Sequence, residues 1–196
     1  MKKINVKIHG ITELLMNSNK GVNPLHPITR MVKVLTAKRK RTEDDEIELF
    51  RLKWLLGLYY DESVGVYVPS QNIEAMIREA AKTLRKGSIA KQISAIVVGP
   101  VNIPLIYDGP KDPDSLWNDP NRKYADIRVG KIKQASVTLC RPRFNTWDLE
   151  FTIKYDETKF GHDELVSLLE LAGHDIGLCD YREKYGHFDV VEVTKL

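Results

Sequence analysis

Residues 66–87 read VYVPSQNIEAMIREAAKTLRKG and contain the clearest helix signal in the chain. From Ile73 onward apolar side chains recur at helical spacing, Ser70 can cap the start, and Gly87 follows two basic residues at the end. The apolar stripe of such a helix must be buried, and the short segment 65–68 before it predicts a strand. We therefore expect this helix to pack on a β-sheet.

Segments on both sides of this helix supply the strands of the sheet. Residues 3–8 and 149–155 alternate between polar and apolar side chains, which is typical of strands with one buried face. By the same criteria we expect further strands at 58–60, 93–98, 103–107 and 188–193, a ribbon of 127–129 and 136–139, and helices at 28–40, 47–57 and 163–172.

When the insertions after the first strand and before the second helix are left out, the order of elements along the chain is strand, helix, strand, strand, helix, strand. This order predicts an α+β fold with a ferredoxin-like or RNA-recognition-motif core, in which two helices cover one face of an antiparallel sheet and the other face is free for a ligand. We expect a single domain over residues 1–196, with a helical insertion at 10–57 and an extended basic, thumb-like insertion at 108–147. Residues 108–126 contain three prolines and five aspartates with little periodicity, which predicts a long functional loop.

Length and composition exclude several classes of protein. The 196 residues, 42% hydrophobic and 29% charged, fit a compact domain and not a disordered chain. No apolar run approaches a membrane span, and the opening MKKINVKIHG has no signal-peptide core, so we expect a cytoplasmic protein without a membrane partner. Cys140 and Cys179 form neither a disulfide framework nor a zinc ribbon, and the histidines are scattered, so no metal or other cofactor is expected.

The net charge of +3 hides an uneven distribution along the chain. Residues 1–147 carry 25 basic and 15 acidic side chains, whereas residues 148–196 carry 5 and 12. This asymmetry favours a basic face for a polyanion and an acidic face for a neighbouring protein or for solvent. An intracellular enzyme with a patchy surface is also compatible with the charge alone.

The extended insertion concentrates positive charge. Between residues 122 and 143 lie Arg122, Lys123, Arg128, Lys131, Lys133, Arg141 and Arg143, against the single acid Asp126. On a projecting ribbon such groups neutralise phosphates without reading the base sequence. Tyr124, Phe144 and Trp147 lie beside them, and we expect their rings to stack on unpaired bases, with burial in the core as the alternative.

The helical insertion holds a second basic segment. Its basic residues are Arg30, Lys33, Lys38, Arg39, Lys40 and Arg41. We expect Arg39 and Arg41 to contact nucleic acid. The acidic run 43–46 follows at once, so a solvated, charge-paired helix surface is the alternative.

Three stretches together resemble the RAMP superfamily, whose members form the RNA-binding backbone of CRISPR surveillance complexes. They are VKIHGITELLMNS at 6–18, VYVPSQNIEAMIREAAK at 66–82 and ELAGHDIGLCDYREKYGHFDVVEV at 170–193. The resemblance implies a functional arginine on the helix after Val68-Pro69-Ser70, here Arg78, and a glycine-rich loop before the last strand. This chain has only Gly177 and Gly186 in that loop, fewer glycines than the family pattern.

The same loop carries the pattern G-x-x-D-Y-R-x-x-x-G-x-F from Gly177 to Phe188, which resembles small phage-encoded proteins of that fold. Basic and aromatic residues alternate between its two glycines. Tyr181, Arg182 and Lys184 there form either a nucleotide clamp or a polar turn. If the source is a phage, the expected location is the host cytoplasm.

Three functions are compatible with these observations. The first is a non-catalytic protein that binds single-stranded DNA or RNA in phage nucleic-acid metabolism and oligomerises along the strand. The second is an anti-CRISPR-type inhibitor, or a mimic of a backbone subunit, that binds a host CRISPR or other defence complex. The third is a metal-independent RNA endonuclease, for which the resemblance leaves His9, Asp112, Asp114 and Asp119 as the candidate residues; aspartates in such a turn also serve as local hydrogen-bond acceptors.

Overall fold

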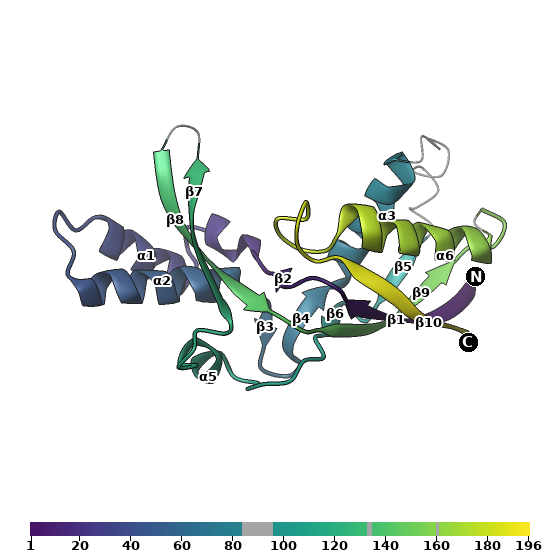
Figure 1. Cartoon of the computed structure of the whole chain (residues 1–196), viewed down its shortest axis with the longest axis horizontal. Helices are drawn as coiled ribbons and strands as arrows, with labels where there is room; N and C mark the ends of the chain where they lie inside the picture. The colour runs from purple at the N-terminus through teal and green to yellow at the C-terminus, as the bar shows by residue number, and fades with distance from the viewer. Residues whose placement is uncertain (84–95, 133–134, 160) are drawn as a thin grey trace. The chain divides into compact units, whose positions relative to one another are not determined.

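The computed structural model describes residues 1–83, 96–132, 135–159 and 161–196, with side chains outside 130–137 (Figure 1). The chain folds as two compact units. The core unit consists of Met1–Leu14, Asp61–Asp108 and Asn145–Leu196, and the inserted unit of Leu15–Tyr60 and Gly109–Phe144.

The core unit is built on a four-stranded antiparallel sheet with the order β10-β1-β9-β5. Its strands are β1 (Lys2–Gly10), β5 (Val97–Gly99), β9 (Asp148–Tyr155) and β10 (Phe188–Lys195). Helix α3 (Ser70–Thr83) lies between β1 and β5 in the chain, and α6 (His162–Leu171) lies between β9 and β10. This order and strand arrangement are those of a ferredoxin-like, RNA-recognition-motif core, which confirms the predicted α+β fold class.

One face of this sheet is covered by α3 and α6, which lie next to each other in Figure 1. The alternation in β1 places Ile4, Val6 and Ile8 on the covered face, where each is at most 1% exposed. Ile73 and Ile77 of α3 are fully buried against the same side. Burial of a large aliphatic side chain contributes roughly 1.5–3 kcal/mol, so this layer accounts for much of the stability of the core unit.

A second, smaller sheet, which belongs to the core unit except for Tyr60, has the order β3-β4-β6. Its strands are β3 (Tyr60–Asp61), β4 (Gly65–Pro69) and β6 (Asn102–Pro104). After β6 the chain returns to β9 through a single bridge, in which the amides of Ile106 and Asp148 donate to each other's carbonyls at 3.0 and 2.9 Å. The chain therefore passes close to the start of β9 before it leaves for the second segment of the inserted unit.

The loop before β10 is held in a fixed shape. A π-helical turn, Ala172–Ile176, follows α6, and Gly177 and Gly186 adopt φ values of +76° and +75°. A Cβ atom at Gly186 would collide with the backbone of Leu178. Both glycines are therefore required by local backbone geometry.

The inserted unit combines a helical hairpin with a β-ribbon. Its elements are β2 (Leu14–Leu15), a 3-10 turn (Asn19–Val22), α1 (Pro27–Thr36), α2 (Glu43–Gly57), α5 (Pro113–Trp117), β7 (Ala125–Ile132) and β8 (Ala135–Phe144). Strands β7 and β8 are antiparallel, and β2 lies beside β8 in a three-stranded sheet. Helix α2 packs against both α1 and β8.

Some predicted boundaries were wrong. Residues 108–126 include α5, because Asp112 caps it by accepting from the Ser115 amide at 2.8 Å and Leu116 is buried beneath it. Helix α1 ends at Thr36 and not at residue 40. The predicted strand 93–98 falls partly outside the described residues, within which β5 covers Val97–Gly99.

No helix in the described ranges has the length and apolar character needed to cross a lipid bilayer.

Candidate nucleic-acid interface

Positive charge is concentrated in the inserted unit. This unit contains 17 basic and 9 acidic residues, a net charge of +8, whereas the core unit contains 13 and 18, a net charge of −5. The basic residues of the inserted unit come from two distant parts of the chain, which the fold brings into one compact unit. A polyanion is therefore attracted to the inserted unit and repelled by the core unit.

The connection between α1 and α2 contains four consecutive basic residues. Lys38 and Arg41 pair with Asp45 at 2.6 Å and with Glu46 at 2.5 Å, which ties them to the first turn of α2. Thr42 caps that turn with a reciprocal hydrogen-bond pair to Asp45. Arg39, and Lys40 beside it, are exposed and form no ion pair with any described residue. Of the two arginines predicted to bind here, Arg39 is thus unneutralised and Arg41 is paired.

A buried carboxylate organises the base of the ribbon. Asp126 in β7 is 3% exposed, and its carboxylate lies 2.5 Å from Arg128 Nε and 4.0 Å from a guanidinium nitrogen of Arg141. Asp126 and Arg141 are direct cross-strand partners. Two predicted phosphate contacts are therefore fixed by one shared acid, and the group keeps a net positive charge. Lys131 belongs to β7 with its side chain outside the described part, and Lys133 lies outside the described residues altogether.

Three further basic residues lie near the base of the ribbon, Arg122 and Lys123 in the turn that leads into β7 and Arg143 in β8. Arg122 has a φ of +51°, lies 4.7 Å over the Trp117 ring and donates to the Trp117 carbonyl at 3.0 Å. Lys123 lies 5.5 Å from the Tyr124 ring, and Arg143 donates to the Lys123 carbonyl at 3.2 Å. These side chains are positioned by neutral partners, so their charges stay available to an anion.

The predicted stacking residues are not available to bases. Tyr124, Phe144 and Trp147 are 4%, 1% and 0% exposed, so the prediction that they stack on a ligand is wrong and the alternative, burial in the core, is correct. The Trp147 indole donates to the Thr12 carbonyl at 2.8 Å and covers Gly10, where a Cβ atom would collide with the ring.

The loop between Gly177 and Gly186 holds the other predicted site residues. Tyr181 is 37% exposed, has a φ of +52° and lies 5.5 Å from the Tyr185 ring. Arg182 pairs with Glu79 of α3 at 2.7 Å, and Lys184 is exposed. Arg78, next to Glu79 on α3, is also exposed. The structure thus brings Arg78 and Arg182 to one part of the core unit, with Glu79 between the helix and the loop.

On the open face of the main sheet, opposite α3 and α6, several polar side chains pair across neighbouring strands, whereas Lys3 and Lys154 are exposed and form no ion pair with a described residue. Lys7 contacts Glu192 at 2.9 Å, Asn5 donates to Glu150 at 2.8 Å, and His9 lies 2.7 Å from Asp148. The hydrogen bond with Glu192 raises the pKa of Lys7, and the same bond lowers the pKa of Glu192. No Phe, Tyr or Trp of the described strands points to this face. It lacks the aromatic platform by which related sheets stack bases.

The residues considered for catalysis have local structural partners. His9 is held by Asp148, Asp112 caps α5, Asp114 lies 3.5 Å from Arg51, and Asp119 accepts from the Asn121 amide at 3.1 Å. Within the described ranges no three His, Cys, Asp or Glu side chains are placed to share a metal ion.

Sequence reasoning did not select Lys53 of α2. This residue is half-buried and makes no ion pair with a described residue. It stands in the run Arg51-Leu-Lys-Trp-Leu-Leu-Gly57, where a single lysine among apolar residues was the available signal.

No protein-family model matches this sequence, and no curated protein matches it. Among solved structures, the chain is similar to a chain in the cryo-EM structure of the type III-B Cmr-beta bound to cognate target RNA. The TM-score is 0.51 at 12% sequence identity, and the alignment covers 100% of this chain and 60% of that chain. At this identity the likeness supports the fold alone, which agrees with the α+β, RNA-recognition-motif-like core expected from the sequence. The chain spans 60% of the length of the solved chain.

Proposed function

We propose that the protein binds single-stranded nucleic acid, with RNA as the preferred ligand, through the inserted unit and without catalysing a reaction on it. The observation that carries the proposal is the net charge of +8 on this unit, which includes unneutralised groups such as Arg39 and Lys123. The similar solved chain comes from an assembly bound to cognate target RNA, which supports RNA over DNA. The open face of the main sheet carries no aromatic side chain from the described strands, which makes it a poor alternative surface.

Copies of the chain then associate along the strand, because the −5 core unit of one copy attracts the +8 inserted unit of the next. The phage origin suggested by the pattern from Gly177 to Phe188 belongs to the same proposal: such a protein coats phage RNA or joins a host complex that carries RNA. Light scattering on the protein with and without a long oligonucleotide tests the association. We expect particles whose mass grows with strand length, and a constant mass would contradict it.

A fluorescence-anisotropy titration with RNA and DNA oligonucleotides tests the binding itself. We expect affinity for RNA that falls by a factor of about 10 or more between about 50 and 200 mM salt, because phosphate contacts release counterions. The double variant Arg39→Glu, Lys40→Glu should weaken binding for all base sequences alike. Lys3→Glu, Lys154→Glu, a double charge reversal on the open face of the core unit, is the matched control and should have little effect. Absence of RNA affinity at low salt would refute the proposal.

Incubation of the same RNA with the protein in EDTA checks the non-catalytic part of the proposal. We expect the RNA to remain full length. Cleavage that disappears in His9→Ala would instead establish the endonuclease function.

One observation favours a second candidate, a protein that binds a defence complex. An apolar groove of about 320 Å³ lies between α1 and α2, and Met31 and Val34 at its edge are 48% and 66% exposed. Exposed apolar side chains in a groove are typical of protein contacts. Binding to a purified CRISPR complex after nuclease treatment, lost in Val34→Glu, would support this candidate.

A further inference from the structure

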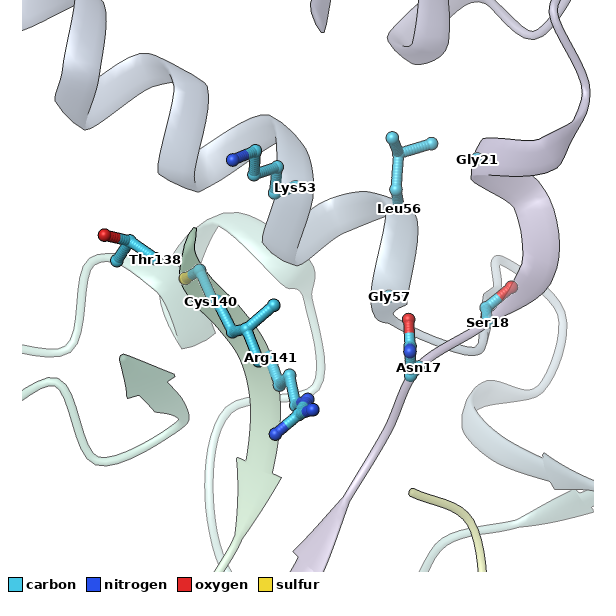
Figure 2. A pocket seen from close by; sticks show the side chains of 10 residues that line it. Asn17, Ser18, Gly21, Lys53, Leu56, Gly57, Thr138, Cys140 and Arg141 are labelled. Carbon is cyan, nitrogen blue, oxygen red and sulfur yellow. The ribbon is translucent and has the colours of Figure 1, made fainter. Parts of the chain in front are cut away.

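A separate cavity of about 320 Å³ lies in the inserted unit between α2, β8 and the 3-10 turn at Asn19–Val22 (Figure 2). Its size is at the lower end of the roughly 300–1,000 Å³ that small-molecule sites occupy. All of its lining residues belong to the inserted unit. The cavity is therefore a feature of one compact unit.

The walls of the cavity are mostly apolar. Leu56 of α2 and Leu139 and Cys140 of β8 line them. Burial raises the pKa of the Cys140 thiol to about 12, so this group is neutral at physiological pH and adds no negative charge. A flat apolar group can therefore pack against Cys140 without meeting a thiolate charge.

The polar groups of the cavity are arranged at its two ends. In Figure 2 the side chains of Lys53 and Thr138 reach toward one end, and those of Arg141 and Asn17 toward the other. Lys53 is half-buried and has no acidic partner among the described residues. An anion bound at Lys53 therefore meets no competing carboxylate among the described residues.

A ligand that matches these walls has an anionic end, a flat apolar body and hydrogen-bonding edges. We propose that the cavity binds one phosphorylated nucleoside, with its phosphate on Lys53 and Thr138, its base against Leu56 and Leu139, and the base edge toward Arg141 and Asn17. Amide, hydroxyl and guanidinium groups supply the donors and acceptors that a base edge requires. The nucleotide is either free or the phosphorylated end of a strand. In the second case the inference rests on the proposed function.

Binding of ribonucleoside 5′-monophosphates to the full-length chain tests the inference. We expect saturable chemical-shift changes at amides of the cavity, such as those of Ser18 and Gly57, at ligand concentrations up to about 1 mM. The unphosphorylated nucleoside and inorganic phosphate should each bind at least about tenfold more weakly, because each lacks one half of the recognised group.

Three variants distinguish binding of the nucleotide in the cavity from nonspecific electrostatic attraction to the protein surface. Lys53→Gln should weaken mononucleotide binding by a factor of about 10 or more, and Leu56→Trp should block the cavity while leaving the charge unchanged. Lys33→Gln, on an exposed face of α1, is the matched control and should have no effect. Circular dichroism confirms that each variant is folded. A Lys53→Gln variant that is folded and binds mononucleotides as the wild type does would overturn the inference.

A comparison of oligonucleotides identifies the source of the nucleotide. Competition by mononucleotide against a 5′-phosphorylated strand, but not against a 5′-hydroxyl strand, indicates the strand end; binding of free nucleotide without such competition indicates a free ligand. Both results support the inference. If the protein binds oligonucleotides but not mononucleotides, the inference is refuted and the proposed function is intact. If it binds mononucleotides but not oligonucleotides, the proposed function is refuted and the inference is intact.

Discussion

Substitution of Trp147 distinguishes a structural residue from a base-stacking residue. The side chain is fully buried, its indole nitrogen donates to the Thr12 carbonyl at 2.8 Å, and its ring lies against Gly10 and 6.3 Å from the Phe188 ring. Trp147→Leu leaves that carbonyl without its donor, at a cost of about 1–3 kcal/mol, and leaves a partly empty site, at a cost of about 1–2 kcal/mol. We therefore expect the free energy of unfolding to fall by about 2–5 kcal/mol.

Urea unfolding followed by circular dichroism measures this loss, and anisotropy under conditions where the variant is folded measures RNA affinity. We expect the affinity to stay within about twofold of the wild type. A stacking role would instead cost about 1–3 kcal/mol of binding per base, a loss of roughly 5- to 150-fold. Unchanged stability combined with such a loss would refute the assignment to the core. If Trp147→Leu fails to fold, Trp147→Phe keeps a ring in the site and gives the same comparison with a smaller stability change.

Three other perturbations test the electrostatics and backbone geometry. Asp126→Asn should lower stability by about 1–3 kcal/mol because two arginines lose their shared acid, and should tighten RNA binding at low salt; weaker binding by a folded variant would contradict the ribbon as an interface. Gly186→Ala should destabilise the loop by about 1–3 kcal/mol in thermal unfolding, since φ is +75° and the new Cβ would meet Leu178; an unchanged midpoint would contradict the geometry. Burial raises the pKa values of Cys140 and Cys179 to about 12, so the folded state keeps protons that the unfolded state releases above about pH 9. Stability should therefore decrease as pH rises from about 9 toward 12, and the decrease should be smaller when both cysteines are changed to alanine; identical profiles would exclude the thiols as its cause.

Local patterns carried most of the information about the core unit. Apolar alternation in β1 and β9 and helical spacing in α3 predicted these elements within a few residues, because each buries one regular face. Apolar periodicity did not predict α5, because this helix has only one to two turns. Its sequence signal is a capping residue, Asp112, followed by a proline. Short helices of this kind depend on the site at which they pack, and that site is formed by residues distant in the sequence.

Candidate binding residues were harder to predict, for a physical reason. Basic residues are recognisable in a sequence, but whether a charge is neutralised depends on partners that the fold supplies: Arg41 pairs across a helix cap, whereas its neighbour Arg39 does not. Aromatic residues pose the same difficulty, because the same side chains serve in base-stacking surfaces and in cores. Tyr124 and Trp147 lie beside basic residues in the sequence, as stacking residues do, but both are buried in the structure. Lys53 was missed because only the folded cavity shows that it lacks a counter-charge.

The bridge between Ile106 and Asp148 has a consequence for how such chains diversify. Because these residues already exchange both backbone hydrogen bonds, the path between them is a hairpin whose tip carries Gly109–Phe144. A tip of this kind can lengthen, shorten or be exchanged without a change of register in the main sheet. Exchange of this tip together with Leu15–Tyr60 would therefore alter the proposed binding surface and leave the register of the main sheet unchanged.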